Sequence, residues 1–273
     1  MYKRRALVVI SFGSTYDAAR EQEIGGITRA LVEAFPRYDL FTGFTSNIIR
    51  RLLAARGLEF LSPREIMDKL VALGYEEVLI QPTHILHGEE YEQKILILKN
   101  NYQEKFLKFV IGNPLLTEPE DYKIVAAAVN SILPPLAKGE GVVFMGHGSP
   151  RNNNDSFGCT YNALQGYFDA LGLPVVIGVV EEEDSPNFQT VLRQLQQRNY
   201  KKVHLYPFMV VAGDHAINDM CGESKDSWKK QIEAMGVATE AHLEGMGRQK
   251  VIQTIFVSHA LQALANTSVT SDK

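Results

Sequence analysis

The sequence predicts an α/β fold of two similar lobes, each a doubly wound parallel sheet flanked by helices, with a cleft between the lobes. Three observations support this prediction. Short apolar runs recur along the 273 residues, and each ends in glycine, proline or hydroxyl residues instead of continuing as a helix. Segments with apolar residues at helical spacing follow most of these runs, as in parallel sheets with crossover helices. The same order of segments then begins again near the middle of the chain.

The first half of the chain alternates between strand-like and helix-like segments. We expect strands at Ala6–Ile10, Leu40–Ser46, Glu77–Pro82 and Phe109–Gly112. We expect helices at Asp17–Phe35, Ile48–Arg56, Ser62–Gly74, Glu90–Lys108 and Asp121–Ile132. The helix start at Ser62 is well marked, because serine can cap the helix, Pro63 fits its first turn and Glu65 can complete a capping box.

The second half repeats this order. GVVFMGHGS at 141–149 resembles ALVVISFGS at 6–14, and YKKVHLYP at 200–207 aligns with YEEVLIQP at 75–82. An apolar run continues from Val203 to Val211, and a final helix is expected at Arg248–Leu264. We therefore expect an N-terminal lobe at 1–137 and a C-terminal lobe at 138–273, with the last helix able to pack back on the first lobe.

Composition excludes several classes of protein. The formal net charge is −4 and no long run of Lys or Arg occurs, so nucleic acid is not an expected partner. The apolar run near the N-terminus is too short for a signal peptide or a membrane span. The two cysteines, Cys159 and Cys221, form no CxxC pair and suit a reducing compartment. We expect a cytoplasmic protein without a membrane partner.

Known catalytic motifs are missing from the sequence. There is no GxGxxG, GxxxxGK[ST] or GxSxG string, which argues against dinucleotide, nucleoside triphosphate and α/β-hydrolase chemistry. HExxH is also absent. The chemistry must therefore come from residues that the fold brings together.

Two histidines stand at the ends of predicted strands. His147 lies between Gly146 and Gly148, and His215 follows Gly213 and Asp214. Loops at the carboxyl ends of parallel strands carry the ligands in open α/β sheets, so we expect both rings to face one cleft.

Further histidines and carboxylates follow other strands. The roles of His84 and His87 stay open, whereas His204, His242 and His259 are expected to be structural. Acidic residues in comparable loops are Glu89, Glu90, Glu181, Glu182, Glu183 and Asp214. Imidazole and carboxylate together suit Co²⁺, Fe²⁺, Ni²⁺ or Zn²⁺, and the lack of paired thiols indicates an open, transient site instead of a closed structural one.

Four strings carry a resemblance to a known family. GHGS at 146–149, VVAGDHAINDM at 210–220, SFGS at 11–14 and LHGEEYE at 86–92 resemble the class II tetrapyrrole metal chelatases, over nearly the whole chain. The chain is similar to those members that insert Co²⁺ into sirohydrochlorin during anaerobic cobalamin synthesis. The alternatives are an iron chelatase of sirohaem or haem synthesis and a non-catalytic metal- or tetrapyrrole-binding protein.

The resemblance implies a lyase-class enzyme with a two-lobed α/β fold. Its partners would be sirohydrochlorin and a divalent metal ion, with Co²⁺ as a substrate and Fe²⁺ as an alternative. No permanently bound cofactor is implied, and a homo-oligomer stays open.

The resemblance also implies the site residues. His147 and His215 correspond to two metal-facing catalytic histidines, and Glu89, at an acidic position of the HGEEYE-like loop, is the third expected catalytic residue. The family also has a glutamate in a GxVE pattern, and residues 178–181 (GVVE) match this pattern, so the resemblance implies Glu181 as the third metal ligand.

Two points of this assignment stay open. Glu182 and Glu183 follow Glu181 directly, so the sequence does not decide which carboxylate faces the metal. The substrate's carboxylates need hydrogen-bond donors, and a flat ring needs close approach to the backbone. The candidates for this binding are Ser11, Gly13, Ser14, Thr15, Ser149 and Arg151.

Overall fold

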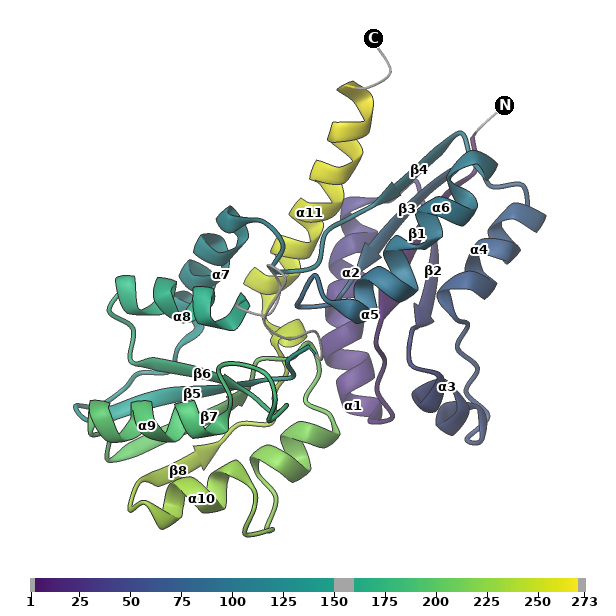
Figure 1. Cartoon of the computed structure of the whole chain (residues 1–273). Helices are drawn as coiled ribbons and strands as arrows, with labels where there is room; N and C mark the ends of the chain where they lie inside the picture. Colours follow the sequence, from purple (N-terminus) through teal and green to yellow (C-terminus); the bar gives the residue numbers. More distant parts are fainter. Residues whose placement is uncertain (1–2, 150–159, 270–273) are drawn as a thin grey trace. The chain divides into compact units, whose positions relative to one another are not determined.

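Two four-stranded parallel sheets organise the chain in the computed structural model, which describes residues 3–149 and 160–269 (Figure 1). The strand order is β2-β1-β3-β4 in one sheet and β6-β5-β7-β8 in the other. Each sheet belongs to its own compact unit: residues 1–117 with 250–273, and residues 118–249.

The first unit contains four strands and most of the helical turns of the N-terminal half. Its strands are β1 (Arg5–Ser11), β2 (Asp39–Phe44), β3 (Glu77–Pro82) and β4 (Lys108–Ile111). Its α-helices are α1 (Asp17–Ala19), α2 (Gly25–Ala34), α3 (Asn47–Ala54), α4 (Pro63–Ala72), α5 (Glu89–Tyr91), α6 (Leu98–Tyr102) and α11 (Lys250–Val269). The π-helical turns are η1 (Arg20–Ile24) and η2 (Glu92–Leu96), and η3 (Gln103–Lys105) is a 3₁₀ turn.

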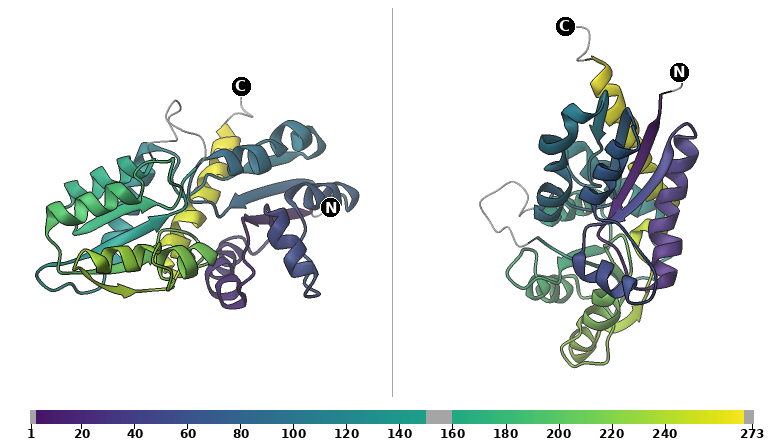
Figure 2. Two further views of the ribbon diagram at one scale, coloured as in Figure 1. Left: turned by 60° about the horizontal axis from the view of Figure 1, so that its bottom comes forward. Right: turned by 90° about the vertical axis from the view of Figure 1, so that its right-hand side faces the viewer.

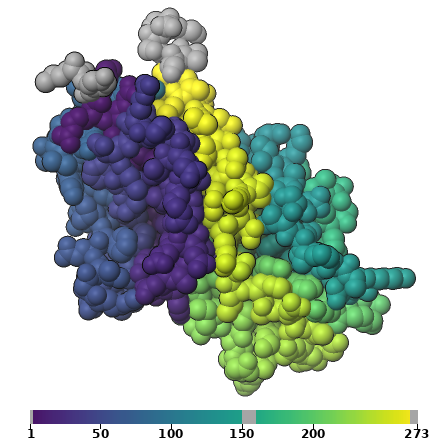
Figure 3. Space-filling view, turned by 180° about the vertical axis from the view of Figure 1, so that it is seen from behind, coloured from purple at the N-terminus to yellow at the C-terminus, as the bar shows by residue number. Residues whose placement is uncertain are grey.

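Helices cover both faces of the first sheet (Figures 1 and 2). Alternate β1 residues Ala6, Val8 and Ile10 pack with α4 and α6 in one buried cluster. The other face is covered by α2 and by α11, which contacts α2, β3 and β4 and lies along α2 in Figure 3. Burial on both faces explains why β1 reads as a continuous apolar run.

The second unit has the same arrangement. Its strands are β5 (Glu140–Gly146), β6 (Val175–Val179), β7 (Lys202–Pro207) and β8 (Ala238–Ala241). Its helices are α7 (Pro119–Ile132), α8 (Thr160–Ala170), α9 (Phe188–Arg198) and α10 (Trp228–Ala234), with the short turns η4 (His215–Met220) and η5 (Met246–Arg248). Val143 and Met145 of β5 pack with α9 and α10, whereas Phe144 contacts Phe168 of α8 at 6.4 Å between ring centroids.

The predicted fold class is confirmed, and several details differ from the expectation. The expected helix Glu90–Lys108 is divided into α5, η2, α6 and η3, and Lys108 already begins β4. The apolar run after Val203 is a strand only to Pro207, because the Phe208 N–H makes the last bond to β5, to the Met145 carbonyl at 2.6 Å. The expected helix Asp17–Phe35 contains a π-helical turn, η1. The short polar strand β8 was not predicted.

The compact units also divide differently from the expected boundary at 137/138. Helix α7 belongs to the second unit and contacts α8, although it precedes the expected boundary. Helix α11 belongs to the first unit. Among the described residues, no helix is both long and apolar enough to span a bilayer.

Candidate metal site

Three of the predicted site residues follow three adjacent strands of the second sheet. His147 comes directly after β5, Glu181 comes two residues after β6, and His215 begins η4 after β7. Since β5 lies between β6 and β7 and all three are parallel, these residues share the carboxyl edge of the sheet. His147 and His215, which the sequence analysis expected to face one cleft, thus both lie at this edge of the second sheet.

The two imidazole rings are in contact. Their centroids are 4.9 Å apart and the ring planes cross at 81°. The Nδ1 atom of His147 lies 3.9 Å from Oε1 of Glu181. The side chains of His147, Glu181 and His215 are 49%, 47% and 40% exposed, so the group is open to solvent on one side. An open group of two imidazoles and a carboxylate can bind a divalent ion and release it.

The orientation of His215 is fixed by Asp219, which the sequence analysis did not select. Asp219 Oδ2 lies 2.6 Å from His215 Nδ1. An ionised carboxylate only accepts hydrogen bonds, so Nδ1 carries the proton and Nε2 keeps its lone pair. Carboxylates hold metal-ligating histidines in this way. The HxxxD spacing on one π-helical turn is the sequence signal that could have revealed it.

A buried carboxylate supports the His147 loop. Asp184 is 6% exposed, and its two oxygens accept hydrogen bonds from the N–H groups of Ser149 at 2.7 Å and Ser185 at 2.6 Å. Gly148 has φ +94°, and a Cβ there would lie 2.9 Å from the Asp184 carboxylate. Glycine is therefore required between His147 and Ser149.

The backbone separates Glu181 from the two glutamates that follow it. The N–H of Glu181 points to the His147 carbonyl at 3.4 Å, and its side chain reaches the His147 ring. Glu182 and Glu183 are exposed, and the Glu182 carbonyl accepts a hydrogen bond from Asn187. Glu181 is thus the member of the acidic run that lies beside a histidine of the site.

The remaining predicted residues of the first lobe lie in the first unit. Glu89 begins α5 and accepts a hydrogen bond from Gln93. Ser11 is buried, and its hydroxyl accepts a hydrogen bond from Thr83 at 2.8 Å. In the loop after Ser11, Gly13 has φ +109°, the Ser14 hydroxyl accepts a hydrogen bond from the Tyr16 N–H, and the Thr15 carbonyl accepts one from Arg56. Their role in binding a tetrapyrrole stays a prediction.

Ser149 is the predicted binding residue of the second unit. It is buried, and its hydroxyl has no hydrogen-bond partner among the described residues. Arg151, the other predicted donor, lies outside the described residues.

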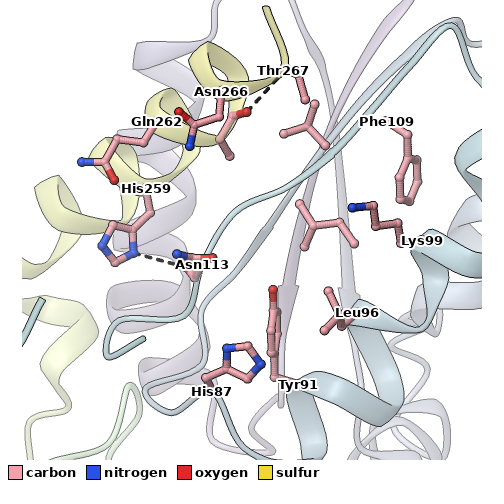
Figure 4. Close-up of a pocket in the computed structure, with 13 residues that line it drawn as sticks. His87, Tyr91, Leu96, Lys99, Phe109, Asn113, His259, Gln262, Asn266 and Thr267 are labelled. Carbon is pink, nitrogen blue, oxygen red and sulfur yellow. Dashed lines mark hydrogen bonds between the residues drawn. The ribbon is translucent and has the colours of Figure 1, made fainter. Parts of the chain in front are cut away.

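The two histidines left open by the sequence have different surroundings. Burial lowers the pKa of His84 to about 4, so this ring is neutral at pH 7. His87 packs edge-on against Tyr91 at 4.7 Å and lines a cavity of about 310 Å³ (Figure 4). His259 of α11 lines the same cavity and bonds the Asn113 carbonyl through Nδ1 at 3.3 Å. None of the predicted site residues that the structure describes lines this cavity.

Sequence comparisons identify relatives over the whole chain. The family model described as cobalt chelatase (CbiK) matches residues 5–265. A sirohydrochlorin cobaltochelatase of Salmonella typhimurium is 37% identical over 262 residues, covering 96% of this chain and 97% of that protein. The sirohydrochlorin cobaltochelatase CbiKC of Nitratidesulfovibrio vulgaris is 30% identical over 264 residues, covering 96% and 91%.

Structural comparisons agree on the fold. SirB from Bacillus subtilis with Fe³⁺ superposes with a TM-score of 0.63 at 14% identity, covering 97% of both chains. CbiX, the terminal enzyme of sirohaem biosynthesis in denitrifying bacteria, gives a TM-score of 0.52 at 16% identity, covering 95% of this chain and 99% of that one. At these identities the likeness concerns the fold alone.

Proposed function

The chain belongs to the cobalt chelatase (CbiK) family, and from that premise we propose that it inserts Co²⁺ into sirohydrochlorin through His147, His215 and Glu181. Two curated relatives over nearly its whole length are sirohydrochlorin cobaltochelatases, which are metal chelatases. The contact between the two imidazole rings, with centroids 4.9 Å apart, is the observation that supports this site.

The reaction makes two demands on the protein. Co²⁺ must lose water ligands, and two pyrrole N–H groups of the macrocycle must lose their protons as the four ring nitrogens bind the metal. Imidazole serves both demands, because a neutral ring nitrogen can bind a metal or accept a proton. One divalent ion enters the ring and two protons leave it, so charge is conserved.

The two histidines would have different roles. Asp219 holds the proton on Nδ1 of His215, which leaves Nε2 to bind Co²⁺. Nδ1 of His147 lies 3.9 Å from the Glu181 carboxylate, which would stabilise the imidazolium that forms when this ring takes up a proton. We therefore assign proton acceptance from a pyrrole N–H to His147, after it has helped to deliver the ion.

Weak binding is part of this function. A site that satisfied every coordination position of Co²⁺ would retain the ion. Here the three side chains are about half exposed, so water can fill the other positions until the macrocycle replaces it. Glu181 adds negative charge beside His147, which favours a cation before transfer.

The first lobe would bind the macrocycle. Ser11, Gly13, Ser14 and Thr15 are proposed for this part on the basis of the family resemblance and of their position at the end of β1 and directly after it. Glu89, which follows β3, is proposed as a further catalytic residue on the same resemblance. Ser149 would donate to a substrate carboxylate from the second lobe, since its hydroxyl is without a hydrogen-bond partner among the described residues.

An insertion assay tests the proposal. Sirohydrochlorin absorbance would be followed with added Co²⁺ for the unchanged chain and for His147→Ala and His215→Ala, with Fe²⁺ and protoporphyrin in parallel. We expect turnover with Co²⁺ and sirohydrochlorin, and its loss in both variants. Binding of both substrates without turnover would indicate a carrier, and normal turnover in His147→Ala would refute the assignment.

A further inference from the structure

A second group of potential metal ligands lies on β7 and at the carboxyl end of β8, the edge strand of the second sheet. Among the described residues, His204, Glu240 and His242 are the group of three whose donor atoms all lie within 4.8 Å of one another. The sequence analysis expected both histidines to be structural. We propose that these three side chains bind one divalent first-row metal ion, independently of His147 and His215.

The sheet itself places the three residues on one face. His204 of β7 pairs directly with Glu240 of β8 in the parallel register. His242 is two residues beyond Glu240 and so projects to the same side. Its backbone N–H donates to the Leu205 carbonyl at 2.9 Å, which extends the β7–β8 pairing past the end of β8. The ligand set therefore rests on paired backbone, which is more rigid than a loop.

The donor distances match the requirement of a small cation. His204 Nδ1 lies 3.1 Å from His242 Nε2 and 3.7 Å from Glu240 Oε2, and His242 Nε2 lies 3.6 Å from Glu240 Oε1. Metal–nitrogen bonds of about 2.0–2.1 Å separate neighbouring ligand atoms by roughly 3.0–3.5 Å. A shared proton also explains the 3.1 Å contact between the two ring nitrogens, so the test must separate a metal from a hydrogen bond.

His204 is oriented as a metal ligand. It is 6% exposed, and its Nε2 has no hydrogen-bond partner among the described residues. This nitrogen faces Glu140 Oε2 at 3.7 Å. A proton on Nε2 would be attracted to that carboxylate, and the lone pair would then be on Nδ1, toward Glu240 and His242. This is the carboxylate–histidine–metal order seen around metal ions in proteins.

His242 is suited to the same role. Its ring stacks on Tyr206 with centroids 4.2 Å apart and planes within 2° of parallel, which fixes its position.

Lys202 is the group that opposes a cation here. Its ammonium is 2.6 Å from Glu240 Oε2 and 3.9 Å from Glu140 Oε1. A carboxylate has two oxygens, so Glu240 can keep this ion pair through one and offer the other to a metal. The carboxylates of Glu140 and Glu240 carry two negative charges against the one positive charge of Lys202. The group therefore has a net negative charge when both imidazoles are neutral.

The test uses the full chain with His147 and His215 both replaced by Ala, so that the first site is absent. Co²⁺ would be titrated calorimetrically and by its visible absorption, which reports nitrogen ligands. We expect one bound ion per chain, and a loss of affinity of about tenfold or more when His242→Ala or Glu240→Gln is added. Glu244→Gln, which changes a nearby carboxylate outside the group, is the matched control.

Lys202→Met provides a second measurement. Removing the ammonium should tighten Co²⁺ binding several-fold if a metal binds beside Glu240, whereas a hydrogen-bonded pair of histidines predicts no gain. Co²⁺ or Zn²⁺ should also raise the melting temperature of the His147→Ala, His215→Ala chain, because an ion that binds only the folded state stabilises it. No bound ion, or equal losses in Glu240→Gln and Glu244→Gln, would overturn the proposal.

Discussion

The two lobes share one backbone arrangement at the carboxyl ends of their first two strands. In the first lobe, the Thr45 N–H donates to the Ser11 carbonyl at 2.9 Å, and the Ser46 N–H donates to the Phe12 carbonyl at 3.2 Å. In the second lobe, the matching pairs are Val180 with Gly146 at 3.0 Å and Glu181 with His147 at 3.4 Å. The equivalent strand orders of the two sheets, β2-β1-β3-β4 and β6-β5-β7-β8, account for these matching hydrogen bonds.

The side chains at the matched positions differ. Phe12 and Ser46 in the first lobe stand where the second lobe has His147 and Glu181. The following glycines, Gly13 and Gly148, both have positive φ. The turn is therefore common to both lobes, whereas the proposed metal chemistry depends on the side chains that the turn presents.

The largest effect on activity is expected when His147 is replaced by phenylalanine, the residue at the matching position of the first lobe. His147→Phe keeps a ring in the same turn but removes the metal ligand and the proton acceptor. Loss of a general base lowers kcat by about 10²–10⁴-fold. We expect this loss in the insertion assay, with an unchanged circular dichroism spectrum. Phe12→Leu is the control in the first lobe, and an equal fall of kcat there would contradict the division of roles.

A smaller loss is expected when Asp219 can no longer hold the proton on His215. Asp219→Asn keeps the size of the side chain, but its amide can donate to Nδ1 and favour the wrong tautomer. Such changes around metal-ligating histidines cost about 10–100-fold. Affinity for Co²⁺, measured by titration, should fall in this range without a fall in melting temperature. Unaltered affinity would remove Asp219 from the site.

Glu181 should have the next smaller effect. Glu181→Gln removes one negative charge beside His147 and should weaken Co²⁺ binding by about tenfold. Glu182→Gln is the matched control, because it removes the same charge one residue further along the acidic run. Equal effects of the two substitutions would mean that the acidic run acts only as a diffuse charge.

The smallest effect concerns stability and comes from the first lobe. In the first lobe, the Thr83 N–H donates to the Ile10 carbonyl, and in the second lobe the Phe208 N–H makes the equivalent bond to the Met145 carbonyl. Thr83 therefore corresponds to Phe208, and the next residue, His84, corresponds to Met209. Burial lowers the folded-state pKa of His84 to about 4 from 6.5. The unfolded chain then binds more protons between these values, so stability is retained above pH 6.5 and lost as the pH falls toward 4.

The measurement is urea unfolding at pH 7 and pH 5. The unchanged chain should lose roughly 1–2 kcal/mol more than His84→Met over this range. This substitution gives the first lobe the second lobe's residue and removes the titrating ring. Identical pH dependence of the two chains would show that His84 is not buried as a neutral ring.

The sequence was sufficient for the parts of the site that depend on the sheet. The sequence placed His147 directly after one strand and His215 in the segment after another, and the carboxyl edge of a parallel sheet presents such segments together. It was insufficient for Asp184 and Asp219, whose importance depends on hydrogen bonds across a loop and along a π-helical turn. An acidic residue in such a place looks like an ordinary surface residue in the sequence.

The missed elements of the fold have similar causes. Strand β8 reads ATEA, which is too short and polar to show strand periodicity, and its pairing with β7 supplies the missing information. Helix α7 was grouped with the lobe that precedes it in sequence, but it contacts α8, which follows much later. The pairing of β8 and the placement of α7 depend on contacts between segments that are distant in the sequence. Hydrophobic periodicity within one segment gives no information on such contacts.

The most direct test of the central claim is an anomalous difference map from crystals of the active chain loaded with Co²⁺. The account predicts one peak within about 2.0–2.2 Å of a ring nitrogen of both His147 and His215. A peak that touches only one of the two rings, or no peak beside them in crystals of a chain that still inserts Co²⁺, would contradict it.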